Sequence, residues 1–339
     1  MRPLAGLRIV EIAAIGPGPF CGMLLAGLGA EVILVERPGG ESNGLPVPRA
    51  FDVPLRDRTC VTLDLKSREG VEAALALAAG ADGMFEGFRP GVAERLGIGP
   101  AACHARNRRL VYGRVTGYGQ SGPLAQRAGH DINFIALTGA LHAMGRAGDA
   151  PEPPLNLVGD YGGGALFLAL GMVAGLLQAA RSGEGCVVDA AMVDGVSSMM
   201  AMVAGLSAAG LWSERRGSNL LDGSAPFYRC YACQDGGFVA VGALEPKFFA
   251  ILAAEAGLDA AGQYDRACWP ALRGKLSCYF AARPRDAHAA RFAGLDACVT
   301  PVLSLAEAAL HPHMAARSAW RLLDGVPHPA AAPRLTPAG

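Results

Sequence analysis

Apolar runs typical of strands alternate with helix-forming segments through the first 120 residues of the chain. Because strands buried on both faces read as short, continuous apolar runs, we predict strands at LRIVEIA, EVILVE, VTLDL, DGMFEGF and LVYGRVTGYG. Ser67 and Gly80 bracket the segment REGVEAALALAA as the N-cap and the C-cap of a helix. Strands separated by helices pair in parallel, so the alternation predicts a doubly wound, Rossmann-like α/β domain.

The length of 339 residues suits two domains better than one. We expect a large α/β domain over residues 1–190, completed by about 320–339, and a linker helix over 191–219. Residues 220–319 read as hairpin-like strands followed by helices and one more strand, which predicts a smaller α+β domain. Within the large domain, residues 41–58 are expected to form an irregular, proline-containing loop.

The segment IGPGPFCG follows the first predicted strand and imitates a dinucleotide-binding loop. Gly16, Gly18 and Gly22 are spaced one residue away from the fingerprint. Pro17 and Pro19 also remove two backbone N–H groups that a pyrophosphate would use. We therefore expect no nicotinamide cofactor here.

The charge balance argues against a nucleic-acid partner, because 30 basic and 30 acidic residues give a formal net charge of zero. Nine cysteines, an odd number without regular spacing, suit free thiols in a reducing compartment and predict a cytoplasmic protein. Cys230 and Cys233 form a CxxC pair, but no second pair completes a zinc ligand set, so no metal is expected.

One uncharged segment, residues 162–180, imitates a membrane span. It is interrupted by glycines, lacks aromatic belts at its two ends and follows closely on Asp160. A fully buried helix is the better interpretation, and we expect no membrane association.

Two acid–base residues stand out from the rest of the chain. His130, in AGHDINF, precedes an apolar helical run, where free backbone N–H groups stabilise negative charge. Asp160, in NLVGDYGGG, is followed by three glycines that allow close approach of backbone or ligand. Taken singly, a satisfied core histidine and a helix N-cap are the better explanations of these two residues, so the residues alone do not establish catalysis.

Seven blocks of sequence settle this choice through a resemblance to a known family. They are LRIVEIAAIGPGPFCGMLLAGLGAEVILVERP, FEGFRPGVAERLGIGP, TGYGQSGPLAQRAGHDINFIALTG, PPLNLVGDYGGGALFLALG, GCVVDAAMVDG, NLLDGSAPFY and VAVGALEPKFF. In order and spacing, from about residue 3 to about 320, they resemble the family III CoA-transferase (CaiB–BaiF) group, and within it the α-methylacyl-CoA racemases. The likeness weakens in loop 41–58 and after about residue 305.

The resemblance implies that the chain interconverts the 2R and 2S forms of 2-methylacyl-CoA thioesters by a two-base 1,1-proton transfer. His130 and Asp160 match the bases for the two faces of the α-carbon. Backbone N–H groups around His130 and Asp131 match the device that stabilises the enolate oxygen. Glu245, in GALEPKF, matches a glutamate that hydrogen-bonds the catalytic histidine from the other subunit.

The same resemblance implies that coenzyme A is bound as part of the substrate and that no separate cofactor is needed. The arginines are expected to pair with phosphates, residues 63–66 to lie along the adenine, and the neighbours of His130 to border the thioester. The implied binding residues are Arg37, Leu63, Asp64, Leu65, Lys66, Arg89, Arg95, Gly129, Ile132 and Asn133.

The resemblance also implies an obligate, interlocked homodimer with active sites between subunits. Met192 is a candidate for an apolar floor under the acyl chain, and core packing explains it equally well. The alternative is a CoA transferase of the same fold, in which Asp160 is the nucleophile. The transferases lack a histidine at the place of His130, which favours the racemase. The length and branching of the acyl chain stay open.

Overall fold

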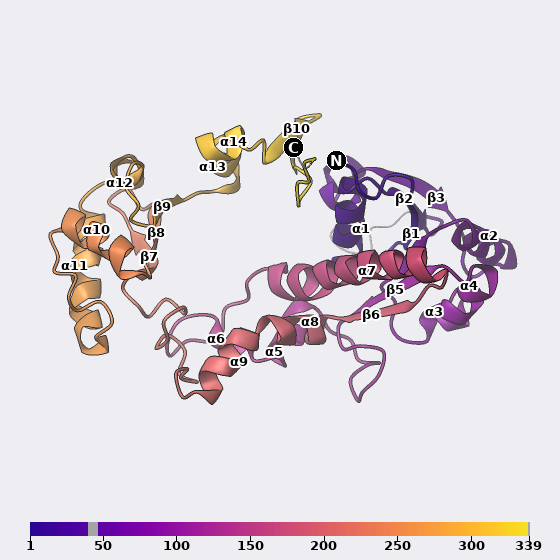
Figure 1. Ribbon diagram of the computed structural model, residues 1–339, viewed down its shortest axis with the longest axis horizontal. Coiled ribbons are helices and arrows are strands. Elements are labelled where there is room, and N and C mark those ends of the chain that lie inside the picture. The colour runs from indigo at the N-terminus through magenta and orange to yellow at the C-terminus, as the bar shows by residue number, and fades with distance from the viewer. Residues whose placement is uncertain (40–46, 338–339) are drawn as a thin grey trace. The chain divides into compact units, whose positions relative to one another are not determined.

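The computed structural model describes residues 1–39 and 47–337 and shows two compact units joined by several chain crossings (Figure 1). The first unit comprises Met1–Leu141, Pro153–Met202 and Ser318–Gly339. The second comprises His142–Glu152 and Val203–Arg317. Each unit has its own hydrophobic core.

A six-stranded parallel sheet forms the centre of the first unit, with the order β3-β2-β1-β4-β5-β6. The strands are β1 (Arg8–Ile12), β2 (Glu31–Glu36), β3 (Arg58–Thr62), β4 (Gly83–Glu86), β5 (Val111–Thr116) and β6 (Val187–Ala191). The strand order reverses between β1 and β4. Ligands of such folds bind outside the carboxyl ends of the strands at this switch point.

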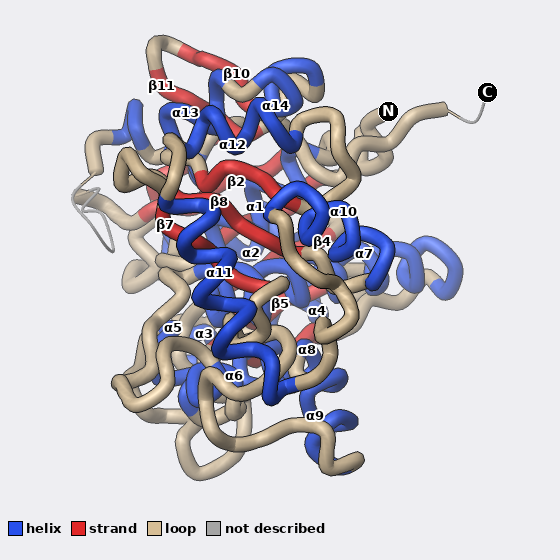
Figure 2. Tube along the Cα trace, turned by 90° about the vertical axis from the view of Figure 1, so that its left-hand side faces the viewer, coloured by secondary structure: helices blue, strands red, loops and turns tan. Residues whose placement is uncertain are grey.

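Helices cover both faces of this sheet, as the alternation of buried side chains along the strands requires. Ile9 and Phe85 pack with helices α1 (Pro17–Gly27) and α7 (Leu166–Ser182) on one face. Val10 and Met84 pack with helices α2 (Arg68–Ala79) and α4 (Pro100–Arg106) on the other face. Figure 2 shows the strands of the sheet in red, with blue helices of the first unit beside them. The predicted doubly wound α/β fold is confirmed.

The helices of the first unit connect successive strands or follow the sheet. They are α1 (Pro17–Gly27), η1 (Arg49–Phe51), η2 (Val53–Leu55), α2 (Arg68–Ala79), α3 (Val92–Arg95), α4 (Pro100–Arg106), α5 (Asp131–Ala136), η3 (Leu157–Ala165), α7 (Leu166–Ser182) and α8 (Met192–Met199). Two further helices, α6 (Ala140–Ala143) and α9 (Ala201–Ala208), lie where the chain leaves the unit. The Ser67 hydroxyl accepts a hydrogen bond from the Gly70 N–H at 3.0 Å, which is the predicted N-cap of α2.

The end of the chain returns to the first unit as a two-stranded antiparallel hairpin, β10 (Trp320–Leu323) and β11 (Val326–Pro329). The Met1 ammonium group donates a hydrogen bond to the Leu335 carbonyl at 3.0 Å, so both ends of the described chain meet on this unit.

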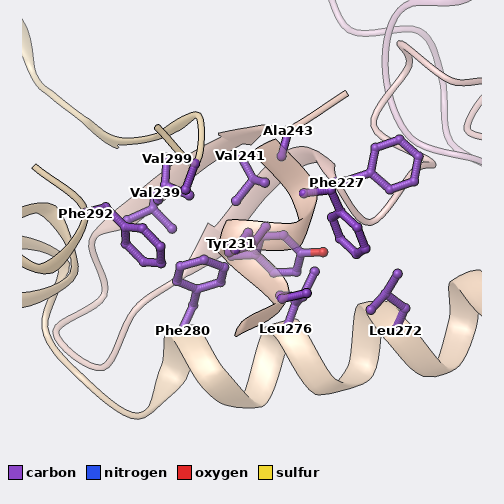
Figure 3. Close-up of a cluster of buried hydrophobic side chains, with 14 of the residues drawn as sticks. Phe227, Tyr231, Val239, Val241, Ala243, Leu272, Leu276, Phe280, Phe292 and Val299 are labelled. Carbon is purple, nitrogen blue, oxygen red and sulfur yellow. The ribbon is translucent and has the colours of Figure 1, made fainter. Parts of the chain in front are cut away.

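The second unit is a three-stranded antiparallel sheet, β7-β8-β9, that packs against helices on one face. Its elements are β7 (Tyr228–Ala232), β8 (Phe238–Gly242), α10 (Pro246–Ala256), η4 (Arg266–Cys268), α11 (Trp269–Ala281), α12 (Arg285–Phe292), β9 (Val299–Val302), α13 (Leu305–Leu310) and α14 (Pro312–Ala316). Figure 3 shows Leu276 and Phe280 of α11 pointing toward Tyr231, Val239 and Val241 of the sheet. This self-contained core explains why the segment folds as a separate unit.

The predicted linker helix over residues 191–219 is wrong in its extent, because two short helices, α8 and α9, cover only residues 192–208 and are separated at Met200. Strand β6, which precedes them and pairs with β5, was not predicted. The second helix ends at Ala208 because Gly210 has a positive φ of 71°, and the backbone N–H groups after it bond back to the last turn.

The predicted loop over residues 41–58 is partly helical. Residues 41–46 lie outside the described residues, and the remainder contains η1 and η2 before β3 begins.

The predicted fully buried helix is a 26-residue helix, Leu157–Ser182, which in length and composition alone could also cross a membrane. One face packs on β5 and β6, but Leu170 and Leu177 on the other face are exposed in the single chain.

Candidate active site

A cavity of about 490 Å³ lies at the carboxyl ends of four strands in the first unit. Each strand leads directly into part of its lining: residues 15–17 after β1, 87–90 after β4, 115–118 at the end of β5, and Met192 after β6. His130 and Asp160 complete the lining. The structure thus places a cavity of ligand size at the switch point of the sheet.

His130 is held at the cavity as the residue that immediately precedes α5. Its backbone is extended, with φ −129° and ψ 175°, and its N–H donates to Asn133 Oδ1 at 3.0 Å. The Phe134 ring, which also lines the cavity, is buried and packs edge-on against the Tyr118 ring. This anchoring of α5 fixes the histidine at the rim while its imidazole is exposed.

Asp160 lies in η3, a π-helical segment that leads into α7. Segments of this kind are uncommon and are often found at functional sites. The segment packs tightly on α8: a Cβ atom on Gly163 would lie 2.5 Å from a Val196 methyl group. The glycines that follow Asp160 therefore serve close packing, which fixes the backbone that carries this carboxyl group.

The electrostatic surroundings of Asp160 disfavour the charged form of its carboxyl group. Burial raises the pKa of Asp160, and the neighbouring charge of Asp131 raises it further. The Asn156 amide, at 3.4 Å from Oδ2, and the charge of His130 act in the opposite direction. A carboxyl group whose pKa is raised is a stronger base and is more easily reprotonated than a solvated one.

A buried ion network supports the loop over residues 87–90, which follows β4 and lines the cavity. Glu86, fully buried at the end of β4, accepts hydrogen bonds from the Phe88 N–H at 2.6 Å and from Arg114 Nε at 2.9 Å. Arg114 also contacts Glu94 at 2.8 Å. Because these charges satisfy one another, the loop that presents Phe88 and Arg89 to the cavity has a defined course.

The structure brings together some of the predicted site residues and separates others. Those that line the cavity are His130, Asp160, Arg89, Gly129, Asn133 and Met192. Asp131 is buried behind the lining, and Ile132 is exposed outside it.

Predicted coenzyme A contacts form a second hollow on the first unit, with a volume of about 400 Å³. Leu65, Lys66 and Arg95 line it, and Lys66 and Arg95 are exposed. Leu63 and Asp64 lie just before this lining and directly after β3, and Asp64 Oδ1 accepts a hydrogen bond from the Lys66 N–H at 3.0 Å.

Two other predicted residues lie elsewhere. Arg37 follows β2 directly, at the same edge of the sheet as the cavity, and is exposed. Glu245 belongs to the second unit, where it is the residue before α10. No residue of that unit lines the cavity within the described chain.

Several lining residues were not predicted: Ile15, Gly16, Phe88, Tyr118 and Arg127. Four of them follow the carboxyl ends of β1, β4 and β5, so the strand pattern contained the signal that could have identified them. Arg127 lies in a long loop between β5 and α5, and only its short distance from His130 in sequence pointed to it.

The chain resembles known proteins over most of its length. The chain is 43% identical to alpha-methylacyl-CoA racemase of Mus musculus, over 98% of this chain and 86% of that protein. It is 40% identical to alpha-methylacyl-CoA racemase of Homo sapiens, over 94% of this chain and 82% of that protein.

Its fold matches the crystal structure of a CaiB/BaiF family protein from Brucella suis with a TM-score of 0.84 and 27% identity, covering 99% of this chain and 93% of the other. The sequence model of CoA-transferase family III matches residues 4–338. The chain is therefore a member of CoA-transferase family III.

Proposed function

We propose that the protein is a racemase that interconverts (2R)- and (2S)-2-methylacyl-CoA thioesters. The observation that carries the proposal is the placement of an imidazole and a carboxyl group, His130 and Asp160, on separate elements lining one cavity. The identity to proteins named alpha-methylacyl-CoA racemase supports the same reaction. A two-base racemisation uses one acid–base group on each face of one carbon, and two such groups line this cavity.

In one direction Asp160 takes the proton from C2, and the electron pair of the C–H bond moves to the thioester oxygen to give an enolate. The protonated imidazole of His130 then returns a proton to the other face. In the reverse direction the roles exchange, so the enzyme ends each turnover with one proton moved between the two groups. The raised pKa of Asp160 suits both tasks, because the group must accept a proton and give it back.

The enolate oxygen needs a hydrogen-bond donor, and the start of α5 offers one. The His130 N–H already donates to Asn133, whereas the N–H of Asp131 has no acceptor among the described residues. We therefore assign the Asp131 N–H as the donor to the thioester oxygen. Loss of such a donor typically costs about 100-fold or more in rate.

The substrate class follows from the rest of the lining. Arg89 and Arg127 offer positive charge for phosphate groups, whereas Ile15, Phe88 and Met192 offer apolar surface for an acyl chain. Lys66 and Arg95 in the second hollow extend the positive surface along the same edge of the sheet. Coenzyme A then enters as part of the substrate, and the proton transfers require no separate cofactor.

The active form that we propose is an interlocked homodimer in the cytoplasm. Leu166, Leu170, Val173 and Leu177 recur along α7 and form an exposed apolar stripe in the single chain. A row of exposed apolar side chains along one helix is typical of an interface. In that dimer, Glu245 of the second unit would orient the imidazole of His130 in the partner subunit.

The alternative is transfer of coenzyme A between acids. There the carboxylate of Asp160 attacks the thioester carbonyl, the C–S bond breaks, coenzyme A leaves as a thiolate, and an acyl anhydride remains on the aspartate. The name of the family favours this alternative, and the presence of His130 in the cavity favours the racemase.

One incubation distinguishes the two reactions. A single epimer of 2-methylacyl-CoA is mixed with the purified protein and an isotopically labelled free acid, and both the configuration at C2 and the label are followed. The racemase produces equal amounts of the two epimers and leaves the label in the free acid. Retained configuration with label in the thioester would establish the transferase and reject the racemase.

A further inference from the structure

The carboxylate of Asp131 is a buried charge for which the proton transfers have no direct use. The residue has 6% of its surface exposed, although it directly follows the exposed His130. Acidic residues are rarely this buried unless they are paired with a cation. No salt bridge of Asp131 is present within residues 1–39 and 47–337, so another interaction must account for its position.

That interaction is with the segment that carries the second base. Asp131 Oδ2 accepts a hydrogen bond from the backbone N–H of Asp160 at 2.6 Å. The carboxylate also lies close against the residue before Asp160, because a Cβ atom built on Gly159 would lie 2.6 Å from the same oxygen. A short hydrogen bond to an ionised acceptor is among the stronger ones in proteins. It joins the start of α5 to η3 across 29 residues of sequence.

The other oxygen of the carboxylate, Oδ1, is buried without a hydrogen-bond partner in the described chain. An unpaired buried oxygen costs stability and calls for an explanation by function. A neutral, apolar residue at this position would avoid that cost, but it would also lose the bond to η3.

We propose that Asp131 is a positioning residue whose carboxylate ties the two bases together and sets the charge that Asp160 experiences. The inference rests on the racemase reaction and adds a role for the Asp131 side chain to the one assigned to its backbone N–H. A group one residue from His130 thereby holds the backbone of Asp160, so the two bases keep a fixed separation on either side of the substrate carbon.

Few other charges face Asp160. At the start of α5 these are Asp131 and His130, and just before η3 the contact is the neutral amide of Asn156. Helices α1 and α8 contribute the non-ionising residues Pro17 and Met192 to the same cavity. Arg89, Arg127 and Tyr118 line its remaining walls. The charge of Asp131 is therefore the nearby charge that disfavours ionisation of Asp160.

Two substitutions of Asp131 distinguish its effect on the position of Asp160 from the effect of its charge. Asp131→Asn keeps the shape and an oxygen acceptor but removes the charge, whereas Asp131→Ala removes both. In wild type, the acid limb of kcat/KM reports protonation of Asp160 in the free enzyme. Because loss of the Asp131 charge lowers the pKa of Asp160, the acid limb of Asp131→Asn moves to lower pH. The equilibrium constant fixes the ratio of kcat/KM for the two epimers, so the limb moves equally in both directions.

We expect kcat/KM of Asp131→Asn at its pH optimum to stay within about tenfold of wild type, since a neutral acceptor still binds the Asp160 N–H. Asp131→Ala should lose about 100-fold in kcat/KM at its pH optimum, because the spacing of the bases is no longer held, and its acid limb should also move to lower pH because the charge is gone. Asp149→Asn, which neutralises an exposed acidic residue in the second unit, is the matched control and should leave the profile unchanged. Circular dichroism confirms that each variant is folded.

An unchanged acid limb in folded Asp131→Asn would overturn the inference, as would folded Asp131→Ala with activity within twofold of wild type. If Asp131→Ala does not fold, the acid limb of Asp131→Asn decides alone. Failure of the proposed function has a different signature, because wild type itself would then leave both epimers unchanged.

Discussion

Gly16 lies directly against the carboxyl group of Asp160, since a Cβ atom built on Gly16 would lie 2.7 Å from Asp160 Oδ2. Gly16 also has φ 67° and ψ −111°, a backbone conformation that essentially only glycine adopts. Gly16 is therefore required for two reasons. Its backbone conformation allows the turn from β1 into α1, and its lack of a side chain leaves room for the carboxyl group that we assign as a base.

Gly16→Ala should therefore impair catalysis more than folding. The methyl group would displace the Asp160 carboxyl group, and misplacement of a reacting group by about 1 Å costs about 100-fold in kcat/KM. The backbone strain adds about 1–3 kcal/mol of destabilisation. Kinetics and thermal unfolding measure the two effects. Gly274→Ala in α11, where a Cβ atom meets nothing within 4 Å, is the control and should retain full activity. Equal activity of the two variants would contradict the crowding at Asp160.

Glu11 and Arg58 form a fully buried ion pair beneath α1, with Nε and Oε2 2.9 Å apart. Burial is the main reason that the pKa of Glu11 is raised from 4.5 to about 7. Because the folded protein holds this proton more tightly than the unfolded chain does, wild type loses stability as pH rises from about 4.5 to about 7. Above pH 7 the loss from this group amounts to about 3 kcal/mol.

Glu11→Gln cannot titrate, so its stability relative to wild type should increase by that amount between pH 4.5 and pH 8. Chemical denaturation at a series of pH values measures the difference. Glu72→Gln, at an exposed ion pair with Arg106, should show no comparable trend. A constant difference between Glu11→Gln and wild type across this range would show that the burial of Glu11 does not govern its ionisation.

Leu170→Glu should weaken or abolish the proposed dimer. Leu170 is 66% exposed in the single chain, so the charge would cost little in a monomer. In an interface the charge would be desolvated without a partner, which is strongly unfavourable. Analytical ultracentrifugation reports the association, and Gln178→Glu, an exposed position on the same helix, serves as the control. Dimers of unchanged stability would exclude this face of α7 from the interface.

Hybrid dimers test whether Glu245 acts across the interface. A subunit carrying His130→Ala, paired with one carrying Glu245→Ala, contains one active site with both lesions and one with neither if the glutamate comes from the partner. Each homodimeric variant should then be poorly active, whereas the hybrid, purified with two affinity tags, should regain about half of the wild-type activity per dimer. A hybrid no more active than its parents would place both residues of a site in one chain.

The parts of the fold that could be predicted are those encoded locally. Ser67 and Gly80 marked both ends of α2, because cap chemistry involves neighbouring residues. The strand β6 was not predicted. Its identity as a strand depends on pairing with β5, more than 70 residues earlier, and short apolar runs do not distinguish strand from helix.

In the candidate site, too, only some features could be predicted from the sequence. His130 and Asp160 were identified by a family resemblance, and their residue types alone did not require a shared cavity. The contacts that define their surroundings, from Asp131 to the Asp160 N–H and from Gly16 to the Asp160 carboxyl group, join segments distant in sequence. Such contacts follow from how η3 packs between α1, α5 and α8, which no local pattern encodes.

Hydrogen exchange at C2 of each epimer in heavy water, measured in His130→Ala and in Asp160→Ala, tests the two-base account most directly. If the two groups face opposite sides of C2, neither variant interconverts the epimers. Each should still introduce deuterium into one epimer with its remaining base, and the two variants should select opposite epimers. Exchange of the same epimer in both variants, or racemisation at the wild-type rate in either, would contradict the account.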